Sequence, residues 1–277
     1  MTEPYFPNQT ADMMEFESRL RHAAQMLPVP IRLATYGLLS NLLASLRPTE
    51  FSLSDGMTVA RQNGGELVFP DPLPLIKLPH IVFGYEEWLE HKYALPGFVE
   101  VEAGDIVVDC GAYVGGFSLS AAKKAGELHA FEPDEVNFRC LSRNLSGAKA
   151  ARLNQAGLYD RSGRMNLNVS ASSVEHSLLM PDDGPPVAIH EIEIVTLSDY
   201  CAARGIDRLD FVKIEAEGVE LEVFAGLGEM RPAKFAIDVS PERNGQSPAA
   251  EFRRRLEGQG YEVRQRGHVM FARRGRA

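Results

Sequence analysis

The sequence is poor in cysteine and tryptophan, and it lacks a long uncharged run. It contains one tryptophan and three cysteines, Cys110, Cys140 and Cys201, which form no Cys-x-x-Cys pair. This odd, scattered set argues against a disulfide framework and fits a reducing compartment. The longest uncharged stretch, residues 33–46, has 14 residues, fewer than the roughly 20 that span a bilayer. Because no basic segment followed by an apolar core opens the chain, we expect a cytoplasmic protein.

Basic residues are also in the minority. Asp and Glu number 38 against 29 Lys and Arg, which leaves a formal charge of −9 over 277 residues. Proteins bind nucleic-acid backbones through basic surfaces that displace counterions, so nucleic acid is not an expected partner. Hydrophobic residues make up 44% and charged residues 24% of the chain, as in an ordinary globular protein.

Composition and periodicity divide the chain into three segments. Residues 1–50 are expected to form a helical extension, which Pro28 and Pro30 split into two helices because proline breaks a helix interior. The leucine-rich second helix could support a homodimer. Residues 51–104 are expected to form a turn-rich entry segment with short antiparallel strands, and residues 105–277 the main domain.

The main domain alternates strands with helices. Ile106 begins a short apolar run, which is typical of a strand buried on both faces of a parallel sheet. We expect strands at residues 106–108, 128–131, 189–195, 209–214, 235–239, 261–263 and 269–272, and helices at residues 117–124, 136–145, 197–203, 219–224 and 249–256. This alternation predicts an α/β fold with an open, doubly wound sheet.

Glycines and carboxylates follow the first two strands of this sheet. Ligands of such sheets bind beyond the carboxyl ends of the strands. Asp109 ends the first strand, and Gly111 and Gly115 allow a tight turn close to a ligand. Glu132 directly follows the second strand, 21 residues after Gly111, where it could accept hydrogen bonds from both hydroxyls of an adenosine ribose.

A glycine turn followed by an acidic residue also occurs in nicotinamide-dependent oxidoreductases. Here the turn at residues 111–116, GAYVGG, lacks the G-x-G-x-x-G spacing that holds a pyrophosphate. Asp109 would repel a pyrophosphate, but it could engage the sulfonium or amino group of S-adenosylmethionine. These features favour S-adenosylmethionine and leave a nicotinamide cofactor as the alternative.

Three sequence blocks resemble the FkbM-type methyltransferases, a branch of the S-adenosylmethionine-dependent enzymes. VVDCGAYVGGFS is similar to the family's Asp-x-Gly-Ala-Asn-x-Gly turn, HAFEPDEVNFRCLSRNL to its Phe-Glu-Pro segment, and LDFVKIEAEGVELEVFAGL to its Lys-Ile-Asp-x-Glu-Gly-x-Glu segment. The likeness runs from about Val82 to Val239 and implies a Rossmann-like class I methyltransferase fold with seven strands. Tyr113 replaces the family's usual Asn, so the glycine turn could be remodelled. Glu215 replaces the usual Asp, which keeps the charge but extends it by one methylene and could move a catalytic contact.

The resemblance and the positions at the strand ends together indicate the site residues. Those expected to hold S-adenosylmethionine are Asp109, Gly111, Ala112, Tyr113, Gly115, Ser118, Glu132, Pro133 and Asn137. Those expected to serve catalysis are Lys213, Glu215, Glu217, Asp238 and His176. Lys213 could equally form a structural ion pair with Glu215 or Glu217. A divalent cation on the carboxylates is possible but not favoured, because no histidine or paired-aspartate motif accompanies them.

We therefore expect an O-methyltransferase that acts on a hydroxyl of a small molecule, natural product or glycan. Methyl transfer requires that donor and acceptor be aligned, and a hydroxyl acceptor also benefits from a base. Three alternatives stay open: methylation of nitrogen or a carboxylate, a nicotinamide-dependent oxidoreductase, and a non-catalytic scaffold that keeps the cofactor pocket.

Overall fold

The structure is a computed structural model that describes residues 27–43, 48–74, 77–170, 176–179, 186–243 and 245–275. These residues fall into two compact units. One lies within Met1–Leu67 and Asp71–Phe83, the other within Val68–Pro70 and Gly84–Ala277. The first of the two helices predicted for the N-terminal extension lies outside the described residues.

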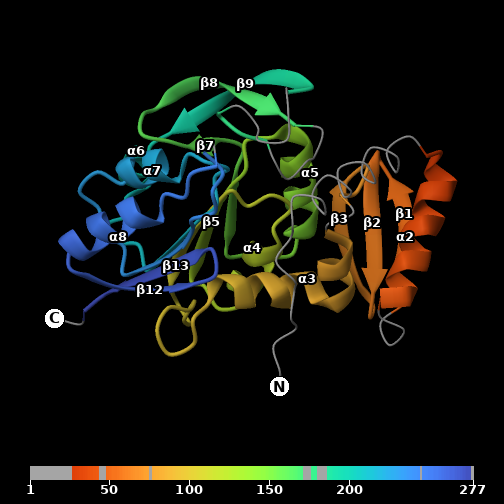
Figure 1. The fold of residues 1–277 in the computed structure, drawn as a ribbon, viewed down its shortest axis with the longest axis horizontal. Coiled ribbons are helices and arrows are strands. Elements are labelled where there is room, and N and C mark those ends of the chain that lie inside the picture. The colour runs from red at the N-terminus through yellow and green to blue at the C-terminus, as the bar shows by residue number, and fades with distance from the viewer. Residues whose placement is uncertain are drawn as a thin grey trace. The chain divides into compact units, whose positions relative to one another are not determined.

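The first unit contains helix α2 (Val29–Leu43), β1 (Glu50–Ser54), β2 (Met57–Gln62) and residues 65–67 of β3 (Gly65–Pro70) (Figure 1). These strands form a sheet in the order β1-β2-β3. Pro30 sits in the first turn of α2, where its missing N–H has no helical partner to lose. The buried Tyr36 donates its hydroxyl to the Leu73 carbonyl at 3.0 Å. Ile31 and Leu38 are exposed on this helix, and the homodimer stays a prediction.

The second unit is built on a sheet of seven strands in the order β12-β13-β11-β10-β4-β5-β6. Its strands are β4 (Ile106–Cys110), β5 (Glu127–Phe131), β6 (Ala151–Asn154), β10 (Phe211–Ile214), β11 (Lys234–Asp238), β12 (Tyr261–Arg266) and β13 (Val269–Arg274). Strands β11, β10, β4, β5 and β6 run parallel, and β13 pairs antiparallel with β11 and β12. The predicted doubly wound, seven-stranded α/β fold is confirmed.

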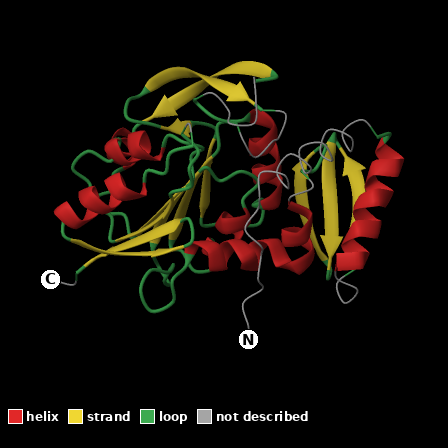
Figure 2. Ribbon diagram, viewed as in Figure 1, coloured by secondary structure: helices red, strands yellow, loops and turns green. Residues whose placement is uncertain are grey.

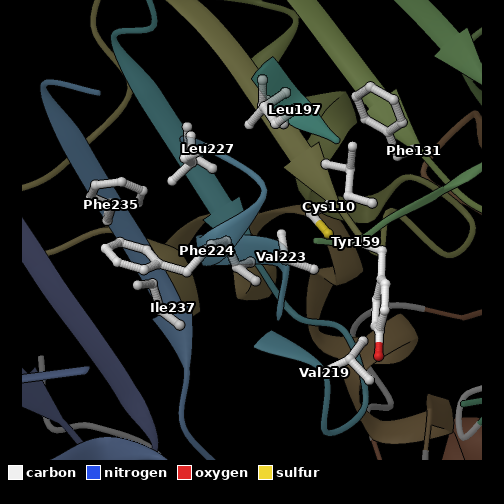
Figure 3. Close-up of a cluster of buried hydrophobic side chains, with 14 of the residues drawn as sticks. Cys110, Phe131, Tyr159, Leu197, Val219, Val223, Phe224, Leu227, Phe235 and Ile237 are labelled. Carbon is white, nitrogen blue, oxygen red and sulfur yellow. The ribbon is translucent and has the colours of Figure 1, made fainter. Parts of the chain in front are cut away.

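Helices cover both faces of this sheet (Figure 2). Alternate residues point to opposite faces of a strand. Val212 and Ile214 therefore join the apolar core beneath α6 (Leu197–Arg204), α7 (Glu220–Ala225) and α8 (Ala249–Gly258). Figure 3 shows part of this core, including Leu197 and Phe224. On the other face Phe211 stacks on Phe117 of α4 (Gly116–Ala121) at 5.7 Å between ring centroids. Helix α5 (Glu135–Asn144) follows β5.

One predicted strand belongs to a different sheet. Residues 189–195 were predicted as part of the central sheet, but β9 (Ala188–Val195) pairs with β7 (Gly157–Leu158) and β8 (Gly163–Val169) in a separate three-stranded sheet. Strand β6, which was not predicted, takes the seventh place in the central sheet. The reason is visible in β9 itself, where Glu191 and Glu193 face solvent and Ile192 and Ile194 are buried, the alternation of a sheet that is covered on one side.

Helix α3 (Leu78–Tyr93) was not predicted either. It bends at Gly84, whose φ of 108° and ψ of 92° lie outside the helical region. Residues 84–93, which follow the bend, belong to the second unit. There Tyr93 packs edge-on against Phe117, with 5.7 Å between ring centroids. This half of α3 therefore lies on the same face of the sheet as α4.

Candidate active site

The polar side chains that follow the strands meet on the α3 and α4 face of the sheet. Asp109 of β4 and Lys213 of β10 are direct neighbours in the parallel register. Asp238 ends the adjacent strand β11, and Glu215 lies two residues after Lys213, on the same side. The fold thus brings together Asp109, which the sequence assigned to cofactor binding, and three residues that it assigned to catalysis.

Five side chains form a continuous series of ion pairs, which we call the charge ladder: Asp109, Lys213, Glu215, Lys92 and Asp238. The Lys213 ammonium lies 3.0 Å from Asp109 Oδ1 and 3.1 Å from Glu215 Oε2. The Lys92 ammonium lies 2.7 Å from Glu215 Oε1 and 2.9 Å from Asp238 Oδ2. Carboxylates and ammonium groups alternate throughout, so each charge has at least one opposite partner.

Both lysines in the ladder stay protonated. Burial alone would lower the pKa of Lys213, which is 2% exposed, but the charges of Asp109 and Glu215 outweigh burial and raise that pKa above its ordinary value. Burial would likewise lower the pKa of Lys92, but the charges of Glu215 and Asp238 outweigh burial and raise that pKa. Lys213 also donates to the Gly111 carbonyl at 2.6 Å, which ties the ladder to the glycine turn.

Sequence reasoning missed Lys92. It lies in the last turn of α3, an element that the sequence did not predict, more than 100 residues before its two partners. The nearest signal in the sequence was that the likeness to the family begins at about Val82, shortly before Lys92. The prediction that Lys213 forms a structural ion pair with Glu215 agrees with the geometry, whereas the sequence did not identify Asp109 as its other partner.

The glycine turn brings β4 close to the segment after β10. Gly111 has φ 72°, and a Cβ there would lie 1.8 Å from the Glu215 carbonyl oxygen, so only glycine fits. Tyr113 has φ 52°. It therefore keeps the left-handed backbone that the family's asparagine favours. Gly115 is also left-handed, and a Cβ there would meet Leu141 and Leu145 of the α5 region within 3 Å.

Glu132 is held by backbone donors beside this turn. Its carboxylate accepts hydrogen bonds from Tyr113 N at 2.9 Å and Asp134 N at 3.0 Å, with Asn137 Nδ2 at 3.4 Å. Only 6% of the residue is exposed. Burial raises the pKa of Glu132 to about 8, because the backbone hydrogen bonds offset only part of the desolvation.

The remaining residues expected to bind the cofactor lie around these groups. Ser118 donates its hydroxyl to Asp109 Oδ2 at 2.7 Å and is fully buried. Ala112 is buried, and its N–H donates to the Phe131 carbonyl at 2.9 Å. Pro133 lies between Glu132 and Asp134, and Asp134 caps α5 by accepting from Val136 N and Asn137 N, both at 2.9 Å.

Two of the expected catalytic residues lie outside the charge ladder. Glu217 has a strained left-handed φ of 49°, and its carbonyl accepts the Ser177 hydroxyl at 2.6 Å. His176 accepts a hydrogen bond from Ser170 N at 3.1 Å and lies 3.9 Å from Asp134 Oδ2, beside the start of α5. Glu220 is buried and accepts from Ala216 N and Gly218 N at 2.9 and 3.1 Å. Glu220 therefore fixes the loop that carries Glu217.

The described part of the chain contains no group of three His, Cys, Asp or Glu side chains that is arranged to hold a metal ion. Within the same ranges, every helix falls short of the length and apolar character that a bilayer crossing requires.

Comparison with known proteins identifies relatives of this chain. Residues 109–263, more than half of the chain, match the model of the methyltransferase FkbM domain. The 31-O-demethyl-FK506 methyltransferase FkbM of Streptomyces tacrolimicus is 27% identical over 84% of this chain and 95% of its own length. Methyltransferase sdnD of Sordaria araneosa is 29% identical over 62% of this chain and 79% of its own length.

Solved structures resemble the fold more distantly. TYW2 of M. jannaschii, solved in complex with AdoMet, is 12% identical, with a TM-score of 0.40 over 80% of this chain and 85% of its own. Likeness at this level carries no argument about the site.

Proposed function

The chain belongs to the FkbM methyltransferase family, and on that premise we propose that it transfers a methyl group from S-adenosylmethionine to a hydroxyl of a small molecule or glycan. The relatives make it a methyltransferase and remove the oxidoreductase alternative. One observation carries the choice of cofactor. Glu132 and the charge ladder lie at the carboxyl ends of the adjacent parallel strands β5 and β4, at the same edge of the sheet.

The residues present suit this cofactor. Glu132 offers a carboxylate whose oxygens can accept from a ribose diol. The left-handed Gly111 and Tyr113 turn the backbone between Glu132 and the ladder. Asp109, Glu215 and Asp238 supply negative charge that would attract the sulfonium and amino groups. When bound, S-adenosylmethionine supplies the methyl group and the leaving sulfur, so the protein has only to align the acceptor and manage its proton.

A hydroxyl acceptor has to lose its proton as the bond from oxygen to the methyl carbon forms. Glu215 and Asp238 reach the ends of β10 and β11, and both accept from Lys92. Glu215 is 26% exposed, so an acceptor from solvent has access to its carboxylate. We assign the general base to this pair of carboxylates. Such assistance is typically worth about 10²–10⁴-fold in rate. The relative named for 31-O-demethyl-FK506 supports an oxygen acceptor.

The oxygen assignment is tested by the product. The protein is incubated with S-adenosylmethionine labelled with ¹³C in the methyl group and with a panel of polyhydroxylated natural products, oligosaccharides, amines and carboxylic acids. We expect a methoxy carbon signal from a hydroxyl-bearing acceptor. Labelled N-methyl or methyl-ester signals without any methyl ether would contradict O-methylation and leave the cofactor assignment intact.

Substituting Glu132 tests the cofactor assignment directly. Glu132→Gln is expected to weaken S-adenosylmethionine binding by about tenfold to a hundredfold, because hydrogen bonds to a charged acceptor contribute about 1.5–3 kcal/mol. The affinity is measured by isothermal titration calorimetry. The exposed Glu135→Gln, three residues further along, is the matched control and should bind as the unaltered protein does. Failure of the unaltered protein to bind S-adenosylmethionine would refute the proposal.

Cofactor binding should also release a proton. With a pKa of about 8, Glu132 is mostly protonated at pH 7. Hydroxyls that donate to the carboxylate favour its ionised form and lower that pKa. The enthalpy of binding should therefore depend on the ionisation enthalpy of the buffer, with release approaching one proton at pH 7 and vanishing above pH 9. Glu132→Gln should abolish the buffer dependence, and its persistence in that variant would point to another group.

A further inference from the structure

The charge ladder carries a net charge that its members cannot cancel. Asp109, Glu215 and Asp238 contribute three negative charges, and Lys92 and Lys213 contribute two positive charges, which leaves −1. Asp109 and Asp238 are 0% and 3% exposed and Lys213 is 2% exposed. Solvent therefore screens this charge poorly.

Two neighbouring carboxyls have raised pKa values, which reduces the negative charge that they add. Burial, followed by the charges of Glu220 and Asp238, raises the pKa of Glu242 to about 9, which favours its neutral form at pH 7. Burial also raises the pKa of Glu220, although backbone donors oppose it. Glu217 is partly exposed and accessible to counterions. The ladder therefore places mostly buried charge at the ends of β4, β10 and β11.

The proposed reaction changes the charge of the cofactor by one unit. S-adenosylmethionine carries a sulfonium, an ammonium and a carboxylate, a sum of +1. When the methyl group leaves, the electron pair of the broken bond returns to sulfur, and the thioether product S-adenosylhomocysteine is neutral overall. A site with a charge of −1 attracts the first molecule more strongly than the second, whatever contacts the two share.

We propose that the charge ladder sets the affinity of the site for S-adenosylmethionine relative to S-adenosylhomocysteine, and that Lys92 is the residue that limits this preference. The inference rests on the proposed function. Lys92 is suited to that role because it is 23% exposed, bridges Glu215 and Asp238 in the ladder and comes from α3, outside the matched family segment. Lys213 is buried against Asp109 and the Gly111 carbonyl, so it serves the fold as well.

The ratio of the two dissociation constants is the readout. Asp238→Asn brings the ladder to zero, and Lys92→Met brings it to −2. Relative to the unaltered protein, the preference for S-adenosylmethionine should fall in Asp238→Asn and rise in Lys92→Met. Each change should be on the order of thirtyfold, as expected for one charge about 8 Å away at an effective dielectric constant near 20. Calorimetric titrations with both ligands at low ionic strength measure the ratio.

Two variants and one ligand separate charge from shape. Lys92→Arg keeps the charge and should keep the ratio of the unaltered protein. Lys123→Met removes a lysine that is 67% exposed and pairs with Glu86 on the surface, and it should leave the ratio unchanged. Sinefungin carries an amine in place of the sulfonium, is cationic at pH 7, and should follow S-adenosylmethionine across the variants. Circular dichroism and thermal melts establish that each variant is folded.

The outcomes are distinct. An equal loss of affinity for both ligands in Asp238→Asn, or ratios that do not move in opposite directions in Asp238→Asn and Lys92→Met, would overturn the inference and leave the cofactor assignment standing. If Lys92→Met does not fold, the ratio of dissociation constants in Asp238→Asn alone decides the test. It is then compared with the ratio in Lys92→Arg, the variant that keeps the charge of the ladder. If the unaltered protein binds neither ligand, the proposed function fails and the inference fails with it.

Discussion

Lys213→Met is expected to destabilise the second unit by about 3–5 kcal/mol, the usual cost of removing one partner from a buried ion pair. The ammonium is 2% exposed and touches Asp109, Glu215 and two backbone carbonyls. Without it, Asp109 remains fully buried, with the Ser118 hydroxyl as a partner and no other ion-pair partner among the residues that the structure describes. Equilibrium unfolding in urea, followed by circular dichroism, measures the change in the free energy of unfolding.

Two further variants identify the cause of this loss. Lys124 is 44% exposed and pairs with Glu90 at 2.5 Å, so Lys124→Met should cost less than about 1 kcal/mol. Adding Asp109→Asn to Lys213→Met removes the uncompensated charge and should recover part of the lost stability. A double variant that is as unstable as the sum of the two single variants would show that lost packing, and not the stranded carboxylate, is responsible.

The sequence predicts most of the central sheet, because its strands are short apolar runs that end in polar residues. The same period-two logic explains why Asp109 and Lys213 share a face, although the sequence could not reveal that they are register neighbours. That pairing depends on β4 and β10 being adjacent in space, while about 100 residues separate them along the chain. Pairing partners of strands distant in sequence are set by tertiary packing, which no local pattern encodes.

The two misassigned or missed elements have local explanations. Polar and apolar residues alternate in β9, from Glu191 to Ile194, and this pattern already indicated a sheet with one exposed face. The central sheet has no such face, because helices cover both of its sides (Figure 2). Helix α3 was hidden by Gly84, which interrupts the helical period. Missing α3 meant missing Lys92, so the sequence yielded the carboxylates of the ladder without the cation that joins two of them.

The glycine turn, in contrast, could be predicted from the sequence. Gly111→Ala in this turn is expected to destabilise the protein by more than about 3 kcal/mol. A Cβ at this position would lie 1.8 Å from the Glu215 carbonyl oxygen, and alanine at a φ of 72° adds about 1–2 kcal/mol of backbone strain. Since the obstacle is backbone, relief requires that β4 and the segment after β10 separate. That movement breaks the Glu215 N–H to Cys110 carbonyl hydrogen bond and displaces the Gly111 carbonyl from Lys213.

Gly111→Ala should therefore lose S-adenosylmethionine binding together with stability, as measured by urea unfolding and calorimetric titration on the same preparation. Gly147→Ala is the matched control, because a Cβ there meets nothing within 4 Å. Its free energy of unfolding should stay within about 0.5 kcal/mol of the unaltered protein, as for most surface changes. If Gly111→Ala were as stable as Gly147→Ala, the two segments would have to lie further apart in solution. The close approach that connects the glycine turn to the charge ladder, and on which the ladder's position beside the cofactor depends, would then be absent.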